Sequence, residues 1–373
     1  MRAPRIKVDK LLLLLIGLLV VAGAMIFTSA AFGLVARGEV GMSSVMFNHL
    51  VGGVCLGLVL LVIGMQVDYH SWRPLAPYLF GLALIATALV FVPGLGFSHG
   101  GGTRWLLIGG YTFQPAETLK IAGVIVAAAY FSMIRAKIAT YSWGLGGLLA
   151  IVALPTLLLI LQPDLGTLGI VLSGICTVFF VAGARWRDIL LVVVCGLLAL
   201  VLIAAVRPYV RDRVITFINP SHNSQAEGYQ IRQSLIAIGS GGILGRGFGQ
   251  GVQKFTYLPE PMGDSIFAVA GEELGFAGGV VLILLFLGLA LRGFFIAAHA
   301  PDLFGTLLAA GISSVLVTQA FINIAAMLSI VPLTGIPLTF VSQGGSAMMI
   351  SLASAGILLS VSKYRAKSAK MAG

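Results

Sequence analysis

One carboxylate, Asp264, stands where a membrane protein could carry out proton transfer. It follows the rigid stretch Pro259-Glu260-Pro261 and closely precedes an apolar run long enough to enter a bilayer. A carboxylate within hydrogen-bond reach of a hydroxyl can act as a general base, so Asp264 is our candidate catalytic residue. The alternative is a helix N-cap, because aspartate is a preferred capping residue.

Basic and acidic side chains also gather before and within the apolar run that starts near residue 118. Pro115 suits the first turn of a helix, which places Glu117 and Lys120 three residues apart on one face, within reach of an ion pair. Ionisable residues at membrane depth mark a functional site by default. We therefore expect Arg104, Trp105, Glu117 and Lys120 to bind substrate. A purely neutralising role for the Glu117–Lys120 pair is equally consistent with the sequence.

Three further stretches interrupt the apolar pattern. Asp164 follows Gln162-Pro163 and opens the next run; capping is its favoured role, with substrate binding as the alternative. The stretch from 335 to 346 contributes Ser342 and Gln343 as candidate substrate contacts. The glycine-rich run 239–251 contains Arg246, a candidate phosphate contact. That run has neither GxGxxG nor GxxxxGK[ST], so we expect no nucleotide there.

The composition is that of a membrane protein. Of 373 residues, 58% are apolar and only 10% are charged, whereas soluble domains carry about 25% charged residues. The net charge of +10 arises mainly from basic residues that flank apolar runs, as topology signals do, so we expect no nucleic-acid binding. Three cysteines inside apolar runs and five scattered histidines predict no structural metal site.

The apolar runs predict an all-α polytopic membrane protein with about ten transmembrane helices. They lie near residues 11–32, 47–66, 75–93, 118–134, 142–161, 165–184, 188–206, 266–291, 304–330 and 341–362. Short basic loops favour both termini in the cytoplasm. The whole chain, 1–373, then forms one domain, with a large extracytoplasmic loop at 207–263 between helices 7 and 8. Within that loop, residues 229–238 are amphipathic and suit an element in the interface plane.

Several of these stretches resemble one family, the shape, elongation, division and sporulation (SEDS) proteins, which include FtsW and RodA. The resemblance is carried by Gly228-Tyr229-Gln230, Gln233 to Gly242, Gly245-Arg246-Gly247, Tyr257 to Glu260, Asp264 to Ala268, Glu272 to Phe276, Gln114 to Glu117, Gln162 to Thr167 and Gly335 to Gly345. These motifs occur in the family's order over most of the chain, and their residues are closer to those of FtsW than to those of RodA.

The resemblance implies a peptidoglycan glycosyltransferase that polymerises lipid II at the outer face of the membrane. It implies that Asp264 matches the family's catalytic aspartate, and that a class B penicillin-binding protein of the division or elongation machinery is the partner. The acceptor hydroxyl would lose its proton to Asp264, while Arg104, Lys120 and Arg246 would stabilise the leaving diphosphate, with Mg²⁺ or Mn²⁺ as a candidate cofactor.

The chain departs from the family pattern at Met262-Gly263, where His-Thr is common, at Gln343, where Tyr is common, and at Thr339, where Pro is common. The missing histidine leaves no neighbouring imidazole to assist Asp264. A flippase for the lipid-linked precursor and a RodA-type elongation role are the alternatives. A flippase should place its polar residues near mid-membrane, whereas these residues lie at the ends of the predicted spans.

Overall fold

The computed structural model describes residues 8–36, 38, 47–99, 102–219 and 227–364. Among these residues, nine helices are long and apolar enough to cross a membrane, and a tenth, α7 (Leu165–Val181), is apolar but has only 17 residues. The nine are α1 (Lys10–Ala36), His49–Gln66 with α3 (Leu56–Gln66), Tyr69–Leu89 with α4 (Trp72–Leu89), α5 (Pro115–Met133), Tyr141–Leu161 with α6 (Gly146–Leu161), α8 (Trp186–Val206), α12 (Ile266–Ala298), α13 (Leu303–Met327) and α14 (Gly345–Ser362). The prediction of a multi-pass helical membrane protein is confirmed.

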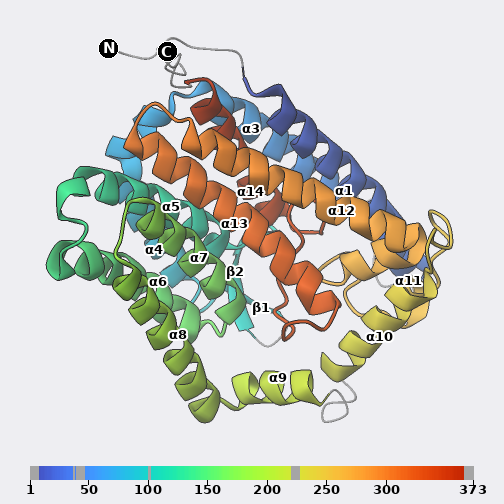
Figure 1. Ribbon diagram of the computed structural model, residues 1–373. Coiled ribbons are helices and arrows are strands. Elements are labelled where there is room, and N and C mark those ends of the chain that lie inside the picture. Colours follow the sequence, from blue (N-terminus) through green and yellow to red (C-terminus); the bar gives the residue numbers. More distant parts are fainter. Residues whose placement is uncertain (1–7, 37, 39–46, 100–101, 220–226, 365–373) are drawn as a thin grey trace.

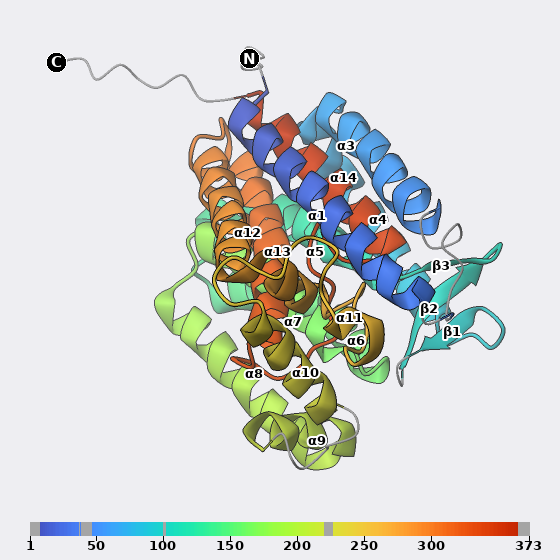
Figure 2. The same ribbon diagram turned by 90° about the vertical axis from the view of Figure 1, so that its right-hand side faces the viewer.

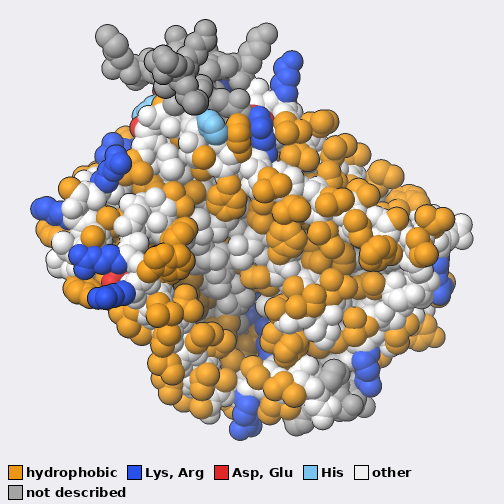
Figure 3. All heavy atoms as spheres, in the orientation of Figure 1, with side chains coloured by type: hydrophobic (Ala, Val, Ile, Leu, Met, Phe, Trp, Pro, Cys, Tyr) orange, Lys and Arg blue, Asp and Glu red, His pale blue; other side chains and the backbone are white. Residues whose placement is uncertain are grey.

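Helices α5, α13 and α14 form the centre of the bundle, and the other long helices surround them (Figure 1). Most residues of these three helices are buried, whereas none in the most apolar part of α8 is buried. Hydrophobic side chains cover most of the face in Figure 3, with Lys and Arg mainly toward its margins. An apolar belt with charges at its edges is what a bilayer requires of an integral protein.

A small antiparallel sheet precedes α5, and the sequence analysis did not anticipate it. Its strands are β1 (Gly96–His99), β2 (Gly102–Ile108) and β3 (Tyr111–Phe113). Ile108 pairs with Tyr111 across Gly109-Gly110, and both glycines have positive φ, as a tight two-residue hairpin turn requires. The sheet stands at one end of the bundle (Figure 2) and carries Arg104 and Trp105 on β2.

The segment 207–263 contains three helices: α9 (Pro208–Ile218), α10 (Glu227–Ser240) and α11 (Gln253–Thr256). The predicted amphipathic stretch is helical, and α10 packs against α12 and α13. Its buried residues are Gly228, Ile231, Ser234 and Ala237. The stretch is therefore an integral part of the wall around the end of the bundle (Figure 1).

Helix α12 is interrupted at Gly275, which has φ of 68°. The glycine-rich run before α11 pairs with the backbone groups that this break frees: Arg246 N donates to Glu272 O at 3.0 Å, and Phe276 N donates to Gly242 O at 2.9 Å. Because unpaired backbone groups are costly at membrane depth, the run and the break stabilise each other. The run is thus a structural partner of α12.

Candidate functional site

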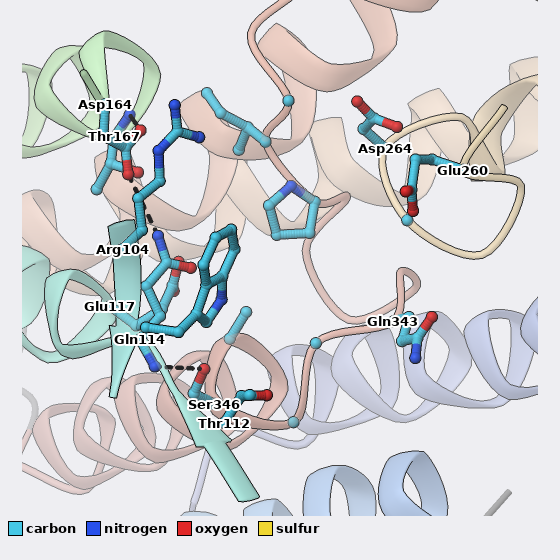
Figure 4. Close-up of a pocket in the computed structure, with 18 of the residues that line it drawn as sticks. Arg104, Thr112, Gln114, Glu117, Asp164, Thr167, Glu260, Asp264, Gln343 and Ser346 are labelled. Carbon is cyan, nitrogen blue, oxygen red and sulfur yellow. Dashed lines mark hydrogen bonds between the residues drawn. The ribbon is translucent and has the colours of Figure 1, made fainter. Parts of the chain in front are cut away.

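A polar cavity of about 350 Å³ opens at the end of the bundle that carries the sheet. Its walls come from segments that are distant in the sequence: Arg104 and Trp105 on β2, Thr112 on β3, Gln114 and Glu117 at the start of α5, Asp164 and Thr167 at the start of α7, Arg213 on α9, Gln230 on α10, Glu260, Gly263 and Asp264 before α12, Gly335 to Pro337, and Gln343 to Ala347. Two arginines and four carboxylates line it. Figure 4 shows Asp264 and Glu260 on one side and Arg104 and Asp164 on the other.

The backbone that carries Asp264 is held at three consecutive carbonyls. Gln343 N donates to Met262 O at 2.7 Å, Ser342 Oγ donates to Gly263 O at 2.6 Å, and Asn323 Nδ2 donates to Asp264 O at 2.8 Å. The segment before α14 and helix α13 thereby fix the position of Asp264 at the start of α12. Ser342 does not line the cavity, so its position indicates support of the Asp264 loop, whereas Gln343 lines the cavity itself.

The Asp264 carboxylate does not cap α12, since the N-cap residue is Ser265. Its Oδ1 instead accepts a hydrogen bond from Gln230 Nε2 at 3.0 Å. Burial raises the pKa of Asp264 to about 6, an effect that the Gln230 bond opposes, that nearby Glu260 increases and that Arg213 opposes. Glu260 itself has φ of 46°, a conformation that is costly for a non-glycine residue and that tends to occur at functional sites. The structure favours chemistry over capping for Asp264.

Asp164 is a helix cap, as its sequence position favoured. Its Oδ1 accepts from Thr167 N at 3.2 Å, and its Oδ2 accepts from Gln114 Nε2 at 3.2 Å (Figure 4). Asp164 nevertheless lines the cavity. Beside it, Arg104 Nη2 donates to Pro163 O at 2.6 Å, which directs the guanidinium along the same wall.

The expected Glu117–Lys120 ion pair is present, with Lys120 Nζ 2.7 Å from Glu117 Oε2. Glu117 lines the cavity, but Lys120 lies behind it, 2% exposed, and donates to Gln319 Oε1 at 2.5 Å. Lys120 therefore faces the interior between α5 and α13. Its position suits a role through Glu117 better than direct contact with a substrate.

Arg246 lies apart from the cavity. Its side chain is 41% exposed, and its Nη1 is 3.7 Å from Glu272 Oε1, beside the break in α12. The sequence makes Arg246 a candidate contact for the diphosphate, but the glycine-rich run that contains it pairs with α12 and Arg246 does not line the cavity. The second arginine of the cavity wall is instead Arg213, which was not among the sequence-predicted site residues and whose Nε lies 2.8 Å from Glu227 Oε1.

Gln230 was likewise not selected, although it lies inside one of the motifs noted above. A neutral amide on an amphipathic helix carries no signal of its own, and only the approach of α10 to the start of α12 brings it to Asp264. Arg213 gave no signal either, because it is one of several arginines between 207 and 213.

Comparison with known proteins identifies the family of this chain. The family model of the cell cycle proteins FtsW, RodA and SpoVE matches residues 9–367. The chain belongs to this family. It is 40% identical over 310 residues to stage V sporulation protein E of Bacillus subtilis (strain 168), covering 83% of this chain and 84% of that protein. It is 35% identical over 365 residues to the peptidoglycan glycosyltransferase MrdB of Escherichia coli (strain K12), covering 97% and 95%.

The fold of this chain is also similar to that of a solved structure. A chain in the solved structure of a peptidoglycan synthase complex that coordinates polymerization and crosslinking superimposes with a TM-score of 0.77 at 28% identity, covering 97% of this chain and 99% of that one. The family and fold that the motifs indicated are thus confirmed.

Proposed function

We propose that this family member is a peptidoglycan glycosyltransferase that joins lipid II units into glycan strands, with Asp264 as the general base. The observation that carries the proposal is a half-buried carboxylate, held from its backbone and its side chain, at the wall of a cavity that also contains two arginines. The raised pKa of Asp264, about 6, suits proton acceptance near neutral pH.

In this mechanism the acceptor hydroxyl gives its proton to Asp264 as its oxygen attacks the anomeric carbon of the donor sugar. The bond from that carbon to the diphosphate oxygen breaks, and the negative charge grows on the diphosphate. Arg104 and Arg213 line the cavity with Asp264 and would stabilise that charge.

A separate apolar cavity of about 260 Å³ supports a lipid-linked substrate. It is lined by Ile160, Leu161, Pro163, Leu165, Ile203, Arg207, Pro208, Tyr209 and Val210. The carbonyl of Pro163 accepts the hydrogen bond from Arg104, so both cavities border the turn before α7. A polyprenyl tail beside α8 would therefore leave its diphosphate near the arginines.

A divalent cation would assist the leaving group in this proposal. Among the residues that the structure describes, no three His, Cys, Asp or Glu side chains are grouped to hold a metal ion. The diphosphate oxygens would therefore supply most of the ligands of a Mg²⁺ or Mn²⁺ ion, which favours those two hard cations.

The proposal also includes a protein partner and a cellular membrane. The similarity to a chain of a peptidoglycan synthase complex supports a class B penicillin-binding protein as partner, within the division or elongation machinery. The protein spans a membrane several times. We propose the bacterial cytoplasmic membrane, with the cavity on the outer side, where the growing strand is needed.

The test is glycan-strand formation from lipid II by the purified full-length protein with its partner. Asp264→Asn keeps the size of the side chain and removes its capacity to accept a proton, so we expect strands to form at least about 100-fold more slowly. Asp264→Glu should retain little activity, because a base misplaced by about 1 Å can lose about 100-fold.

The matched control is Asp212→Asn, the same change on α9 at a residue that is half-buried and does not line the cavity. It should polymerise at nearly the normal rate. A flippase would be indifferent to the base strength of Asp264. Near-normal polymerisation by Asp264→Asn would show that Asp264 is not the base.

A further inference from the structure

The side chain that contacts the Asp264 carboxylate comes from the segment between helices α8 and α12, not from the bundle. Gln230 Nε2 on α10 lies 3.0 Å from Asp264 Oδ1 and 3.0 Å from Ser265 Oγ. An ionised carboxylate only accepts hydrogen bonds, and an amide nitrogen has two hydrogens. The Gln230 amide can therefore donate one hydrogen to Asp264 Oδ1 and the other to Ser265 Oγ. We propose that Gln230 is a positioning residue that orients the Asp264 carboxylate, and that it does so only while α10 is seated against α12 and α13.

The contact with Gln230 leaves the other carboxylate oxygen for the reaction. A Cβ atom at Gly335, which lines the cavity, would lie 3.9 Å from Asp264 Oδ2. Oδ2 is therefore the oxygen on the Gly335 side of the cavity, while Oδ1 is engaged by α10. With Asn323 holding the carbonyl of Asp264, the backbone and the side chain of this residue are fixed by two different helices.

The seat of α10 is largely apolar. Ile231 and Ala237 are buried, and Ser234 Oγ lies 3.5 Å from Met327 Sδ on α13. A hydrogen bond of 3.0 Å is lost once its atoms separate by little more than 0.5 Å. Small movements of α10 would thus release Asp264 while the bundle stays intact, which makes the base sensitive to anything that binds this segment.

The charged groups around Asp264 would not replace Gln230. Glu260 on the same loop repels a second negative charge, and Arg213 on α9 is paired with Glu227 of α10. The other charged side chains that line the cavity are Arg104, Glu117 and Asp164. Loss of the Gln230 donor should therefore favour the protonated form of Asp264, because a bond to the charged form is removed.

This inference rests on Asp264 as the base, and the experiment separates the two. Gln230→Leu is compared with Gln233→Leu, the same change on the same helix at a residue outside the cavity lining. Steady-state polymerisation of lipid II is followed from pH 5 to 8. We expect Gln230→Leu to lower kcat about 10- to 100-fold with little change in KM, and to move the acidic limb of the profile up by about one pH unit. Gln233→Leu should match the unmodified protein.

A purely structural role, or a direct contact of Gln230 with the substrate, predicts a different result. In both cases the acidic limb would stay in place, with a lower yield of folded protein or a higher KM respectively, and either result would overturn the inference. If Gln230→Leu is poorly recovered, Gln230→Asn carries the same test, because its amide is one methylene too short to reach Asp264. The Asp264→Asn variant serves as the reference: if it remains active, the base assignment itself has failed, whereas an inactive Asp264→Asn with an unshifted Gln230→Leu profile rejects only the role of Gln230.

Discussion

At the scale of single residues, the chemistry depends on how Asp264 holds its proton. Burial opposes the charged form and raises the pKa to about 6, and Glu260 acts in the same direction. Gln230 and Arg213 act in the opposite direction. A base works best when its pKa lies close to the operating pH, because it is then mostly ionised yet still basic enough to take a proton. Together with a backbone hydrogen bond that also lowers the pKa, these influences place Asp264 in that range.

The pH dependence of the reaction follows from this pKa. The base must be deprotonated, so kcat/KM should fall about tenfold per pH unit below pH 6 and become level above about pH 7. The measurement is initial-rate polymerisation of lipid II across that range, with Asp212→Asn as the control for nonspecific effects. A profile that stays flat between pH 5 and 7 would contradict a buried carboxylate as the base.

The Glu117–Lys120 pair can be tested by exchanging its charges. Removing either partner leaves an uncompensated buried charge, which destabilises a protein by about 3–5 kcal/mol, so both single neutral variants should fold poorly. The double variant Glu117→Lys, Lys120→Glu restores a neutral pair, and we expect it to restore the yield of folded protein.

The exchanged pair should nevertheless remain inactive. It places a positive charge on the cavity wall at 117 and a negative charge behind it, next to Gln319. Folded yield is measured by size-exclusion chromatography, and activity by glycan-strand formation. Full activity in the exchanged variant would mean that the pair only neutralises itself, and both residues would leave the proposed site.

At the scale of elements, the contact between the glycine-rich run and the break in α12 depends on close approach of two backbones. A Cβ at Gly241 would lie 2.0 Å from Gly271 O, whereas a Cβ at Gly239 would meet no atom within 4 Å. Gly241→Ala should therefore destabilise the protein by about 1–3 kcal/mol through overpacking. Gly239→Ala should be neutral or stabilising by up to about 1 kcal/mol.

Thermal unfolding in detergent compares these two variants directly. The same chemical change is made two residues apart. A midpoint for Gly241→Ala below that of the unmodified protein reports the close approach, and Gly239→Ala shows the effect of a methyl group that meets no neighbouring atom. Equal midpoints would show that the run does not pack against α12 as described.

The elements also show what the sequence could and could not reveal. Long apolar runs, the cap at Asp164 and the ion pair at Glu117 are local patterns, and the structure contains all three. The hairpin also has a local signal, Gly109-Gly110 between short apolar segments. The positions of Arg213 and Gln230 in the cavity depend on how α9 and α10 fold back over the bundle, and no local pattern encodes that packing.

At the scale of the whole molecule, the two described chain ends meet at one end of the bundle, and the sheet and α9 lie at the other (Figures 1 and 2). Residues of the sheet and of α9 line the cavity. Asp9 N bonds to Ser362 Oγ at 3.2 Å, and Arg292 Nη2 pairs with Asp9 Oδ2 at 2.6 Å. An even number of membrane crossings between residues 10 and 362 accounts for this meeting. It requires α7 to count as a crossing, although it has only 17 residues.

The last prediction concerns which side of the membrane holds the cavity. Basic residues in the short loops beside the chain ends favour the cytoplasm for that end, so the segment that contains α9 and α10 should face outward. Reporter tags at both termini and near Gly144 to Gly147 should therefore be protected from outside. A tag at Ser221, which lies outside the described residues, should be accessible. If Asp264 were on the cytoplasmic side, the glycan strand would form where no cell wall is built. Labelling of Ser221 from the cytoplasm would therefore overturn both the topology and the proposed polymerase.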